Sequence, residues 1–427
     1  MRKLSFIAAL LCATLVLLST AVRAQDAKDA EYWIYFGTMG SDTTPEMREH
    51  GVERSQGIYV AKYNALTGEV SDVTLALKAQ AAGYIATTSN PPMLYVVGGL
   101  EPRDGWSKAF AISADPKTGA LSVVNGVDAE GHGACHVSVN SEGTYLGAAN
   151  YNSGIFSVLS INADHSVGKV TAKFHRDGSG PLTRRQEHSY GHSSYFVEDN
   201  GVTHVFMSDL GADKVYCATL DVQTGALTQD EKVPYLAPPP GAGPRHLCFA
   251  RDKNDKLIVF SINELDSTLS AFRVDFNEGA ERLGTWTTIQ DKYRDKLTDE
   301  ESLVDGKTYT YGNKTAAIEV LTLANGRTVV YASNRGQDSI VVFDASEVIA
   351  GKEEPNFPLL QRIPSYGRFP RFFMLDPLNR HLVVSNKMSG SIYVYTIDQE
   401  TGELSLASEE PTRLAWCIAG GFIKVEK

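Results

Sequence analysis

The sequence predicts an all-β fold assembled from seven similar repeats. Short runs rich in β-branched and aromatic residues alternate with Gly, Asn and Asp turns, a pattern typical of strands. These runs cover residues 32–37, 57–63, 93–97, 145–149, 205–209, 257–262, 329–333 and 381–385. Long stretches with helical period are scarce, which disfavours a parallel α/β sheet because its strands need long crossover connections.

A turn glycine followed by the start of a strand gives the length of the repeat. The clearest copies contain Thr-Gly, at Gly68, Gly119, Gly225 and Gly402. Weaker copies complete a set of seven whose neighbours lie 49 to 72 residues apart, at Gly168, Gly279 and Gly351. A period near 50 residues with about four short strands per copy is the signature of a β-propeller, in which each copy forms one blade. We therefore predict a seven-bladed β-propeller.

The ends of the chain and one long spacing refine this prediction. In a ring of blades, a strand from the amino end closes the circle by joining the last blade, and residues 32–37 are the candidate. The longest spacing, 72 residues, indicates a polar insertion between the fifth and sixth blades at about residues 291–313. We predict that residues 25–427 form one domain, since no linker divides them.

The first 24 residues have the pattern of a secretory signal peptide. Arg2 and Lys3 precede an apolar stretch over residues 4–18, and Val22 and Ala24 occupy the small-residue cleavage positions. No later apolar run approaches the roughly 18 residues that a membrane helix needs. We expect cleavage after Ala24 and a periplasmic or secreted protein with no membrane association afterwards. An uncleaved amino-terminal anchor is the alternative.

Charge and histidine spacing limit the class of ligand. The 40 Lys and Arg against 51 Asp and Glu give a formal charge of −11, which disfavours sequence-independent binding to nucleic acid. His132 and His136, like His188 and His192, have a four-residue spacing that would suit metal ligands on a helix. Neighbouring glycines indicate loops instead. We expect neither a metal nor a cofactor.

Eight short polar motifs recur at blade-like separations. They are Cys135-His136 with Ala149-Asn150-Tyr151, Arg185-Gln186 with His192, Asp209-Leu210-Gly211-Ala212-Asp213, Gly243-Pro244-Arg245-His246, Asn263-Glu264-Leu265, Ile318-Glu319, Ser333-Asn334-Arg335-Gly336 and Phe369-Pro370-Arg371-Phe372. In this order they resemble the motifs of the seven-bladed lactonase family, which contains propeller 6-phosphogluconolactonases and carboxymuconate-lactonizing enzymes. The resemblance implies a metal-free site at one mouth of the central channel, built from His, Arg and Glu of several blades.

Opening a lactone requires an activated water, stabilisation of the carbonyl oxygen and a proton for the leaving oxygen. We expect Glu264, at the end of an apolar strand, to be the base and His192 to pass the proton. Arg245 and Arg335 would stabilise the oxyanion or anchor an acid group, because guanidinium forks suit anions. The side chains expected to bind substrate or hold the catalytic groups are His136, Arg185, Gln186, Glu319 and Arg371. Glu319 could exchange roles with Glu264, and either Glu could instead be a structural partner of an Arg.

One position departs from the family pattern. Family members usually carry Pro-His before the second His of the Arg-Gln segment, where this sequence has Ser189-Tyr190. His188 could substitute for the missing imidazole or could lie exposed. The sequence thus predicts an exported lactonase acting on a sugar-acid or related lactone. We expect a monomer whose ligand is a small anionic or sugar-derived lactone. The alternatives are a non-catalytic propeller that binds a sugar acid or a protein partner, a carboxymuconate-type lactonizing enzyme, and a metal-dependent lactonase.

Overall fold

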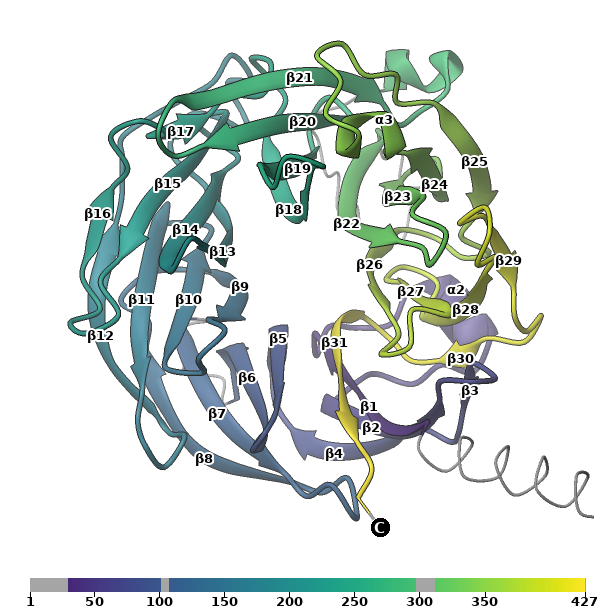
Figure 1. Ribbon diagram of the computed structural model, residues 1–427. Coiled ribbons are helices and arrows are strands. Elements are labelled where there is room, and N and C mark those ends of the chain that lie inside the picture. Colours follow the sequence, from purple (N-terminus) through teal and green to yellow (C-terminus); the bar gives the residue numbers. More distant parts are fainter. Residues whose placement is uncertain (1–29, 101–106, 297–311, 427) are drawn as a thin grey trace, which may run out of the picture.

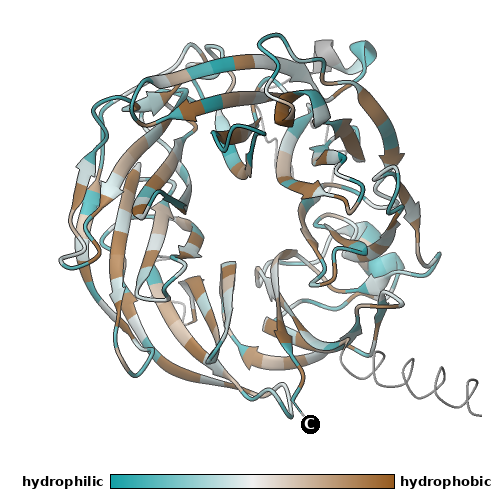
Figure 2. Cartoon of the chain, in the orientation of Figure 1, coloured by the Kyte–Doolittle hydropathy of each residue, from teal (hydrophilic) through white to brown (hydrophobic). Residues whose placement is uncertain are grey.

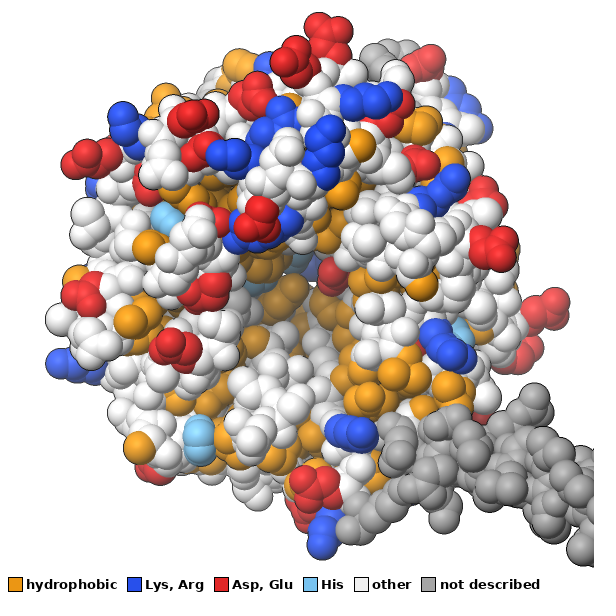
Figure 3. All heavy atoms as spheres, in the orientation of Figure 1, with side chains coloured by type: hydrophobic (Ala, Val, Ile, Leu, Met, Phe, Trp, Pro, Cys, Tyr) orange, Lys and Arg blue, Asp and Glu red, His pale blue; other side chains and the backbone are white. Residues whose placement is uncertain are grey.

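The computed structural model describes residues 30–100, 107–296 and 312–426, which form a ring of seven β-sheets (Figure 1). Each sheet is one antiparallel blade, and the ring is hollowed at its centre, where the innermost strands surround a channel (Figure 3). The predicted all-β, seven-bladed β-propeller is confirmed. The predicted signal peptide, residues 1–24, and residues 297–311 of the predicted insertion lie outside the described residues.

Blade 1 combines the two ends of the chain. Its innermost strand is the carboxy-terminal β31 (Cys417–Lys424), and its other strands are β1 (Glu31–Thr38), β2 (Gly57–Asn64), β3 (Glu69–Val70) and β4 (Thr74–Lys78). β1 pairs antiparallel with β31, from Tyr32 opposite Lys424 to Thr38 opposite Cys417. The predicted closing strand therefore does close the ring, and it does so by receiving the last strand of the chain on its inner edge.

The other six blades follow in chain order, each from its inner strand outward. Blade 2 contains β5 (Ala81–Ser89), β6 (Pro92–Gly99), β7 (Lys108–Ala114) and β8 (Leu121–Asp128). Blade 3 contains β9 (Ala134–Val139), β10 (Tyr145–Asn150), β11 (Ile155–Ile161) and β12 (Val167–Phe174). Blade 4 contains β13 (Gly191–Asp199), β14 (Val202–Asp209), β15 (Lys214–Leu220), β16 (Leu227–Gln229) and β17 (Tyr235–Leu236).

Blades 5 to 7 repeat the same arrangement. Blade 5 contains β18 (Pro244–Arg251), β19 (Leu257–Asn263), β20 (Thr268–Asp275) and β21 (Gly279–Thr287). Blade 6 contains β22 (Lys314–Thr322), β23 (Thr328–Arg335), β24 (Ser339–Asp344) and β25 (Leu359–Pro364). Blade 7 contains β26 (Pro370–Leu375), β27 (His381–Asn386), β28 (Ser391–Ile397), β29 (Leu404–Leu406) and β30 (Thr412–Arg413).

Helical segments in the described residues are short. They are α2 (Pro45–Glu49), α3 (Ser346–Ile349) and the 3₁₀ turn η1 (Asp291–Lys296), which follows blade 5 in the connection to blade 6. No helix in these parts of the chain has the length and apolar character that crossing a membrane requires.

The hydrophobic core lies between blades, because both faces of each sheet are apolar. Neighbouring residues of a strand point to opposite faces. In β1, Tyr35 packs with Leu94 of blade 2, whereas Ile34 and Phe36 pack with Val383 of blade 7. An equivalent cluster fills each interface between neighbouring blades. Figure 2 accordingly shows apolar residues along strands throughout the ring. A blade thus buries both faces only when it has a neighbour on each side.

The repeated Thr-Gly turns are contacts between blades. Their glycines, Gly68, Gly119, Gly225 and Gly402, have left-handed φ angles of +74° to +79°. Each amide donates to the carbonyl of an Asn or Asp four residues earlier. In blade 7, a Cβ added to Gly402 would lie 2.7 Å from Val329 of blade 6, and the Tyr331 hydroxyl donates to the Gly402 carbonyl at 2.8 Å. Each Thr-Gly turn that recurs in the sequence therefore packs against the preceding blade.

We expect Gly402→Ala to lower the free energy of unfolding by about 2–4 kcal/mol. A left-handed conformation costs an L-residue roughly 1–2 kcal/mol, and forcing a methyl group against Val329 adds roughly 1–3 kcal/mol. Gly326→Ala is the control, because Gly326 has a similar φ of +84° but no heavy atom within 4 Å of an added Cβ. Urea unfolding of both variants measures the difference. Equal losses would contradict a role of the turn in packing blades together.

Candidate active site

Every inner strand carries a β-bulge close to one end. In β13 the pairing passes from Gly191 to Ser193, which leaves His192 without a paired position. The same shift leaves Arg245 unpaired in β18 and Arg371 unpaired in β26. A bulge changes the direction of a side chain relative to the regular alternation of a strand. These three residues each occupy the second position of an inner strand, so the bulges bring their side chains to the same mouth of the channel.

A second repeated position supplies the remaining groups. It is the residue after an Asn near the end of the second strand of a blade, and its examples are Tyr151, Glu264, Arg335 and Lys387. The backbone amides of Tyr151, Glu264 and Lys387 donate to the residue that precedes the inner strand of the same blade, at 2.8–2.9 Å. Those hydrogen bonds hold the turn beside the start of the inner strand. Bulge and turn residues thus share one end of the ring.

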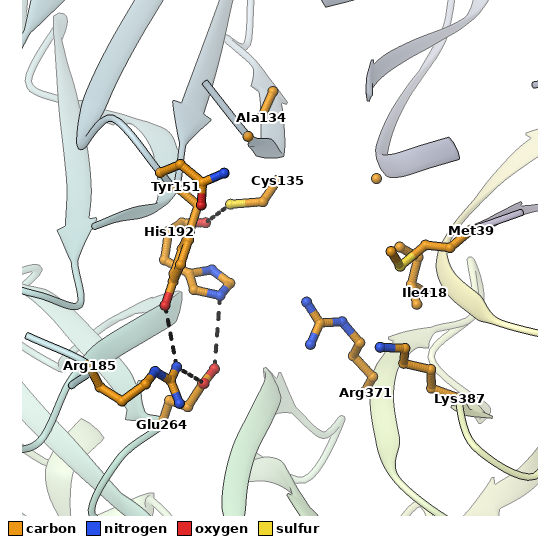
Figure 4. Close-up of a pocket in the computed structure, with 13 residues that line it drawn as sticks. Met39, Ala134, Cys135, Tyr151, Arg185, His192, Glu264, Arg371, Lys387 and Ile418 are labelled. Atoms are coloured by element: carbon orange, nitrogen blue, oxygen red, sulfur yellow. Dashed lines mark hydrogen bonds and ion pairs between the residues drawn. The ribbon is translucent and has the colours of Figure 1, made fainter. Parts of the chain in front are cut away.

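These side chains surround a pocket of about 450 Å³, called the mouth pocket here (Figure 4). The volume suits a small molecule. Its polar lining includes Tyr151, Arg185, His192, Glu264, Arg371 and Lys387, and apolar lining residues include Met39 and Ile418. In Figure 4, His192, Arg185 and Glu264 lie on one side of the pocket, and Arg371 and Lys387 lie on the other.

Glu264 is the one carboxylate in this lining, and three guanidinium groups hold it. Arg185 Nη2 lies 2.8 Å from Glu264 Oε1, while Arg245 Nε and Arg335 Nη2 lie 2.9 Å and 2.7 Å from Oε2. Burial favours the neutral acid, but the charges of Arg335, Arg185 and Arg245 outweigh it and hold the pKa of Glu264 well below its usual range. Glu264 is therefore an ionised side chain with little tendency to accept a proton.

His192 lies beside this carboxylate as a neutral imidazole. Its Nε2 is 3.9 Å from Glu264 Oε2, a distance for interaction by charge and not for a hydrogen bond. Burial, followed by the charge of Arg245, lowers the pKa of His192 well below its usual value. A neutral ring can accept a proton, and Glu264 would then stabilise the imidazolium that forms. Because both oxygens of Glu264 are engaged by arginines, the arrangement favours His192 over Glu264 as the proton acceptor.

Arg185 reaches the pocket from the loop that precedes β13. Gln186 anchors this loop, because its Nε2 donates to the Leu210 carbonyl at 2.8 Å and to Asp213 Oδ1 at 2.7 Å. Besides Glu264, Arg185 Nη2 contacts the Tyr151 hydroxyl at 3.3 Å. Its Nη1 is buried and has no hydrogen-bond partner among the described residues. This guanidinium can therefore donate to a bound ligand.

The opposite wall adds two further cations. Arg371 directs its guanidinium into the pocket (Figure 4) and makes no hydrogen bond or ion pair with any residue that the structure describes. Lys387 Nζ lies 4.9 Å from the centre of the Trp416 ring. Behind Glu264, burial and then the charges of Arg335 and Arg371 lower the pKa of Arg245 to about 9. The cationic groups outnumber Glu264, so the mouth pocket attracts anions and developing negative charge.

Comparison with known proteins places this site in a family. The family model described as a seven-bladed β-propeller lactonase matches residues 34–418. The chain belongs to this lactonase family. It is 30% identical over 352 residues to a 6-phosphogluconolactonase of Bacillus subtilis, covering 82% of this chain and 90% of that protein. A 6-phosphogluconolactonase of Formosa agariphila is 28% identical, with 83% and 92% coverage. The predicted family and, at this level, the predicted enzyme class are confirmed.

A solved structure extends the comparison of the fold. The periplasmic gluconolactonase of Pseudomonas aeruginosa matches this lactonase with a TM-score of 0.73 over 93% of this chain and 100% of that one. The two sequences are 22% identical, so the likeness is one of fold.

The residues predicted from sequence occupy three kinds of position in this lactonase. Arg185, His192, Glu264 and Arg371 line the mouth pocket, and Arg245 and Arg335 contact Glu264. Gln186 holds the loop of Arg185. His136 and Glu319 lie deeper in the channel, where Glu319 lines a second cavity and does not line the mouth pocket. Sequence analysis did not single out Lys387 or Tyr151 as site residues.

At Ser189 and Tyr190, where the sequence departs from the family pattern, both side chains contact neighbouring residues near the mouth pocket. Ser189 Oγ donates to Asp209 Oδ2 at 2.5 Å, and the Tyr190 ring packs on the Tyr151 ring with centroids 4.8 Å apart. His188 is exposed, and its Nδ1 lies 2.7 Å from the Ser189 carbonyl. Of the two interpretations of His188, the exposed one agrees with the structure. Tyr190 instead supports Tyr151, which contacts Arg185.

Proposed function

We propose that this lactonase hydrolyses a sugar-acid lactone in the mouth pocket. The observation that carries the proposal is a buried, ionised Glu264 beside a neutral His192, facing the unpaired guanidinium of Arg371 across the pocket. Such a pocket can activate a water on one side and stabilise an oxyanion on the other. The 6-phosphogluconolactonase relatives support a lactone of a sugar acid as the substrate class.

The proposed reaction uses His192 as the base. Its Nε2 takes a proton from water, and the hydroxide attacks the lactone carbonyl carbon. Arg371 stabilises the negative charge on the carbonyl oxygen, and Glu264 stabilises the imidazolium. When the tetrahedral intermediate collapses, the bond to the ring oxygen breaks, and His192 returns its proton to that oxygen. The product acid then ionises and releases a proton to solvent.

The compartment expected from the sequence limits which lactones can be the substrate. The signal-peptide pattern of residues 1–24 supports export to the periplasm or beyond, away from cytoplasmic sugar phosphates. We infer that unphosphorylated aldonolactones or related sugar-acid lactones are the substrates.

Proton release from a panel of lactones tests this proposal. The panel contains gluconolactone, other aldonolactones and 6-phosphogluconolactone, each compared with its spontaneous hydrolysis. We expect catalysed release with at least one unphosphorylated aldonolactone. Tight binding of an aldonate without any catalysed hydrolysis would favour the non-catalytic alternative and overturn the proposal.

Lys387→Met tests the anionic part of the pocket. We expect the KM for 6-phosphogluconolactone to rise about tenfold with little change in kcat, because Lys387 binds a distant anionic group equally in ground and transition states. The KM for gluconolactone should change less. Lys62→Met is a matched control, since Lys62 Nζ also lies over a tryptophan, 5.5 Å from the Trp33 ring centre, but outside the pocket. Equal KM changes for both lactones would exclude this role of Lys387.

A further inference from the structure

A second cavity of about 340 Å³ lies deeper in the central channel. This channel cavity is lined by Tyr84, Tyr195, His246, Glu319 and Phe372, among others. The inner strands run from the mouth pocket towards it. In β13, Tyr195 is three residues beyond His192, which places it roughly 10 Å deeper at about 3.3 Å per residue. The channel thus contains two separate cavities in series.

Neutral imidazoles separate the two cavities. His246 lines the channel cavity, and its ring centre lies 5.2 Å from that of His192, which lines the mouth pocket. His136 packs against His246 at the same distance and against Tyr84 at 4.3 Å. Burial is the main reason that the pKa of each of these three rings lies below its usual value. The three rings themselves therefore bring no positive charge to the channel cavity.

Glu319 is the acidic group of the channel cavity. Its side chain is partly exposed to the cavity, and it makes no hydrogen bond or ion pair within the described parts of the chain. The titratable groups that face it are Tyr84 from β5, Tyr195 from β13, and His246 and Cys248 from β18. None of them is a cation, and the Arg245 guanidinium, which contacts the His246 ring at 3.3 Å, is itself paired with Glu264. Burial without a counter-charge raises the pKa of Glu319 to about 7.

Aromatic rings form much of the remaining wall. Tyr84 packs edge-on against Phe372 and His246, with ring centres 6.1 Å and 5.6 Å apart, and Tyr195 contacts Phe249 at 5.6 Å. Aromatic rings attract cations through their faces and also pack against carbon substituents. A divalent metal ion would need several oxygen ligands. No group of three or more His, Cys, Asp and Glu residues that could hold a metal occurs in the described residues.

We propose that the channel cavity binds a small organic ammonium ion, whose charge pairs with Glu319 and whose carbon substituents pack against Tyr84, Tyr195 and Phe372. The ligand is opposite in charge to the anion that suits the mouth pocket. Binding stabilises the ionised form of Glu319, so it is accompanied by release of a proton wherever that side chain is protonated beforehand.

Calorimetric titration with choline tests this site, using 3,3-dimethylbutan-1-ol as the neutral probe of nearly the same shape. At about pH 8, where Glu319 is mostly ionised, we expect choline to bind at least about tenfold more tightly than the alcohol. Between about pH 8 and about pH 5 the affinity for choline should fall by at least about tenfold, while the affinity for the alcohol stays constant.

Glu319→Gln separates the charge from the shape of the cavity. We expect this variant to bind choline no better than the alcohol and to lose the pH dependence. Glu281→Gln, at a half-exposed surface position, is the control and should bind as the native protein does. Equal binding of choline and the alcohol by the native protein, or no binding of choline, would overturn the proposal even if the Glu319→Gln variant failed to fold. Lactone hydrolysis is measured in a separate assay, so failure here is distinguishable from failure of the proposed function.

Discussion

Replacing Glu264 by glutamine lowers the free energy of unfolding by about 3–5 kcal/mol. The substitution keeps the size of the side chain but removes the charge that Arg185, Arg245 and Arg335 share. Arg245 and Arg335 are almost fully buried, so their charges would lose their counter-ion in a poorly solvated place. Removing one partner of a buried ion pair commonly costs this much. Urea unfolding measures the loss.

Glu281→Gln is the matched control for this prediction. Glu281 also contacts an arginine, Arg273, but its side chain is 61% exposed. An exposed ion pair contributes at most about 1 kcal/mol. A loss for Glu264→Gln as small as the loss for Glu281→Gln would mean that the arginines do not depend on Glu264.

The pH dependence of stability adds a second test of Glu264. Its pKa is lower in the folded protein than in the unfolded chain. Its contribution is therefore fully present above the unfolded value, about 4.3, and is lost as the pH falls below it. The stability difference between the native protein and Glu264→Gln should narrow as the solution is acidified below about pH 4. A difference independent of pH would contradict the ionised state assigned to Glu264.

The fold could be predicted from the sequence because the features that produce it are local and recur in each blade. A Thr-Gly turn needs a left-handed glycine, and both faces of every strand must be apolar when each blade packs between two others. Such features recur with the blade and can be counted without an alignment. The closing strand was predictable for a similar reason, since a ring without it would expose an unpaired edge.

The site could be predicted less completely, because the positions of its side chains depend on strand register. His192, Arg245 and Arg371 reach the mouth pocket through bulges, and a bulge is a property of two paired strands rather than of one segment. Glu319 shows the consequence. It stands five residues beyond Lys314, the first residue of β22, so its side chain lies well below the mouth. A motif match alone carries no information about that depth.

One signal for the missed residues is present in the sequence. Lys387 and Tyr151 each follow an asparagine, as do Glu264 and Arg335. All four dipeptides lie at the end of the second strand of a blade, and the repeat of that position would have identified Lys387 and Tyr151 as further residues of the site. Arg185 has no such equivalent, because it belongs to the loop between blades 3 and 4 and not to a repeated position of the strands.

Replacing His192 by glutamine should reduce kcat for lactone hydrolysis by about 10²- to 10⁴-fold. Loss of a positioned general base has an effect of this size. Glutamine retains polarity and much of the volume of the ring but cannot accept the proton of water. The KM should change little, since binding by Arg185, Arg371 and Lys387 is retained. Initial rates of proton release, with a thermal unfolding curve to verify folding, measure the effect.

The pH profile decides whether His192 acts as this base. Because burial and Arg245 lower its pKa, His192 stays neutral well below the usual imidazole value of about 6.5, and kcat/KM should stay level through that pH before it falls on the acid side. His188→Gln, the same change at the exposed neighbouring histidine, should leave both the rate and the profile as in the native enzyme. A profile that falls near pH 6.5 and loses this step in His188→Gln would transfer the role to His188. A fully active His192→Gln would remove the imidazole from the reaction and leave only the charges around Glu264 to account for catalysis.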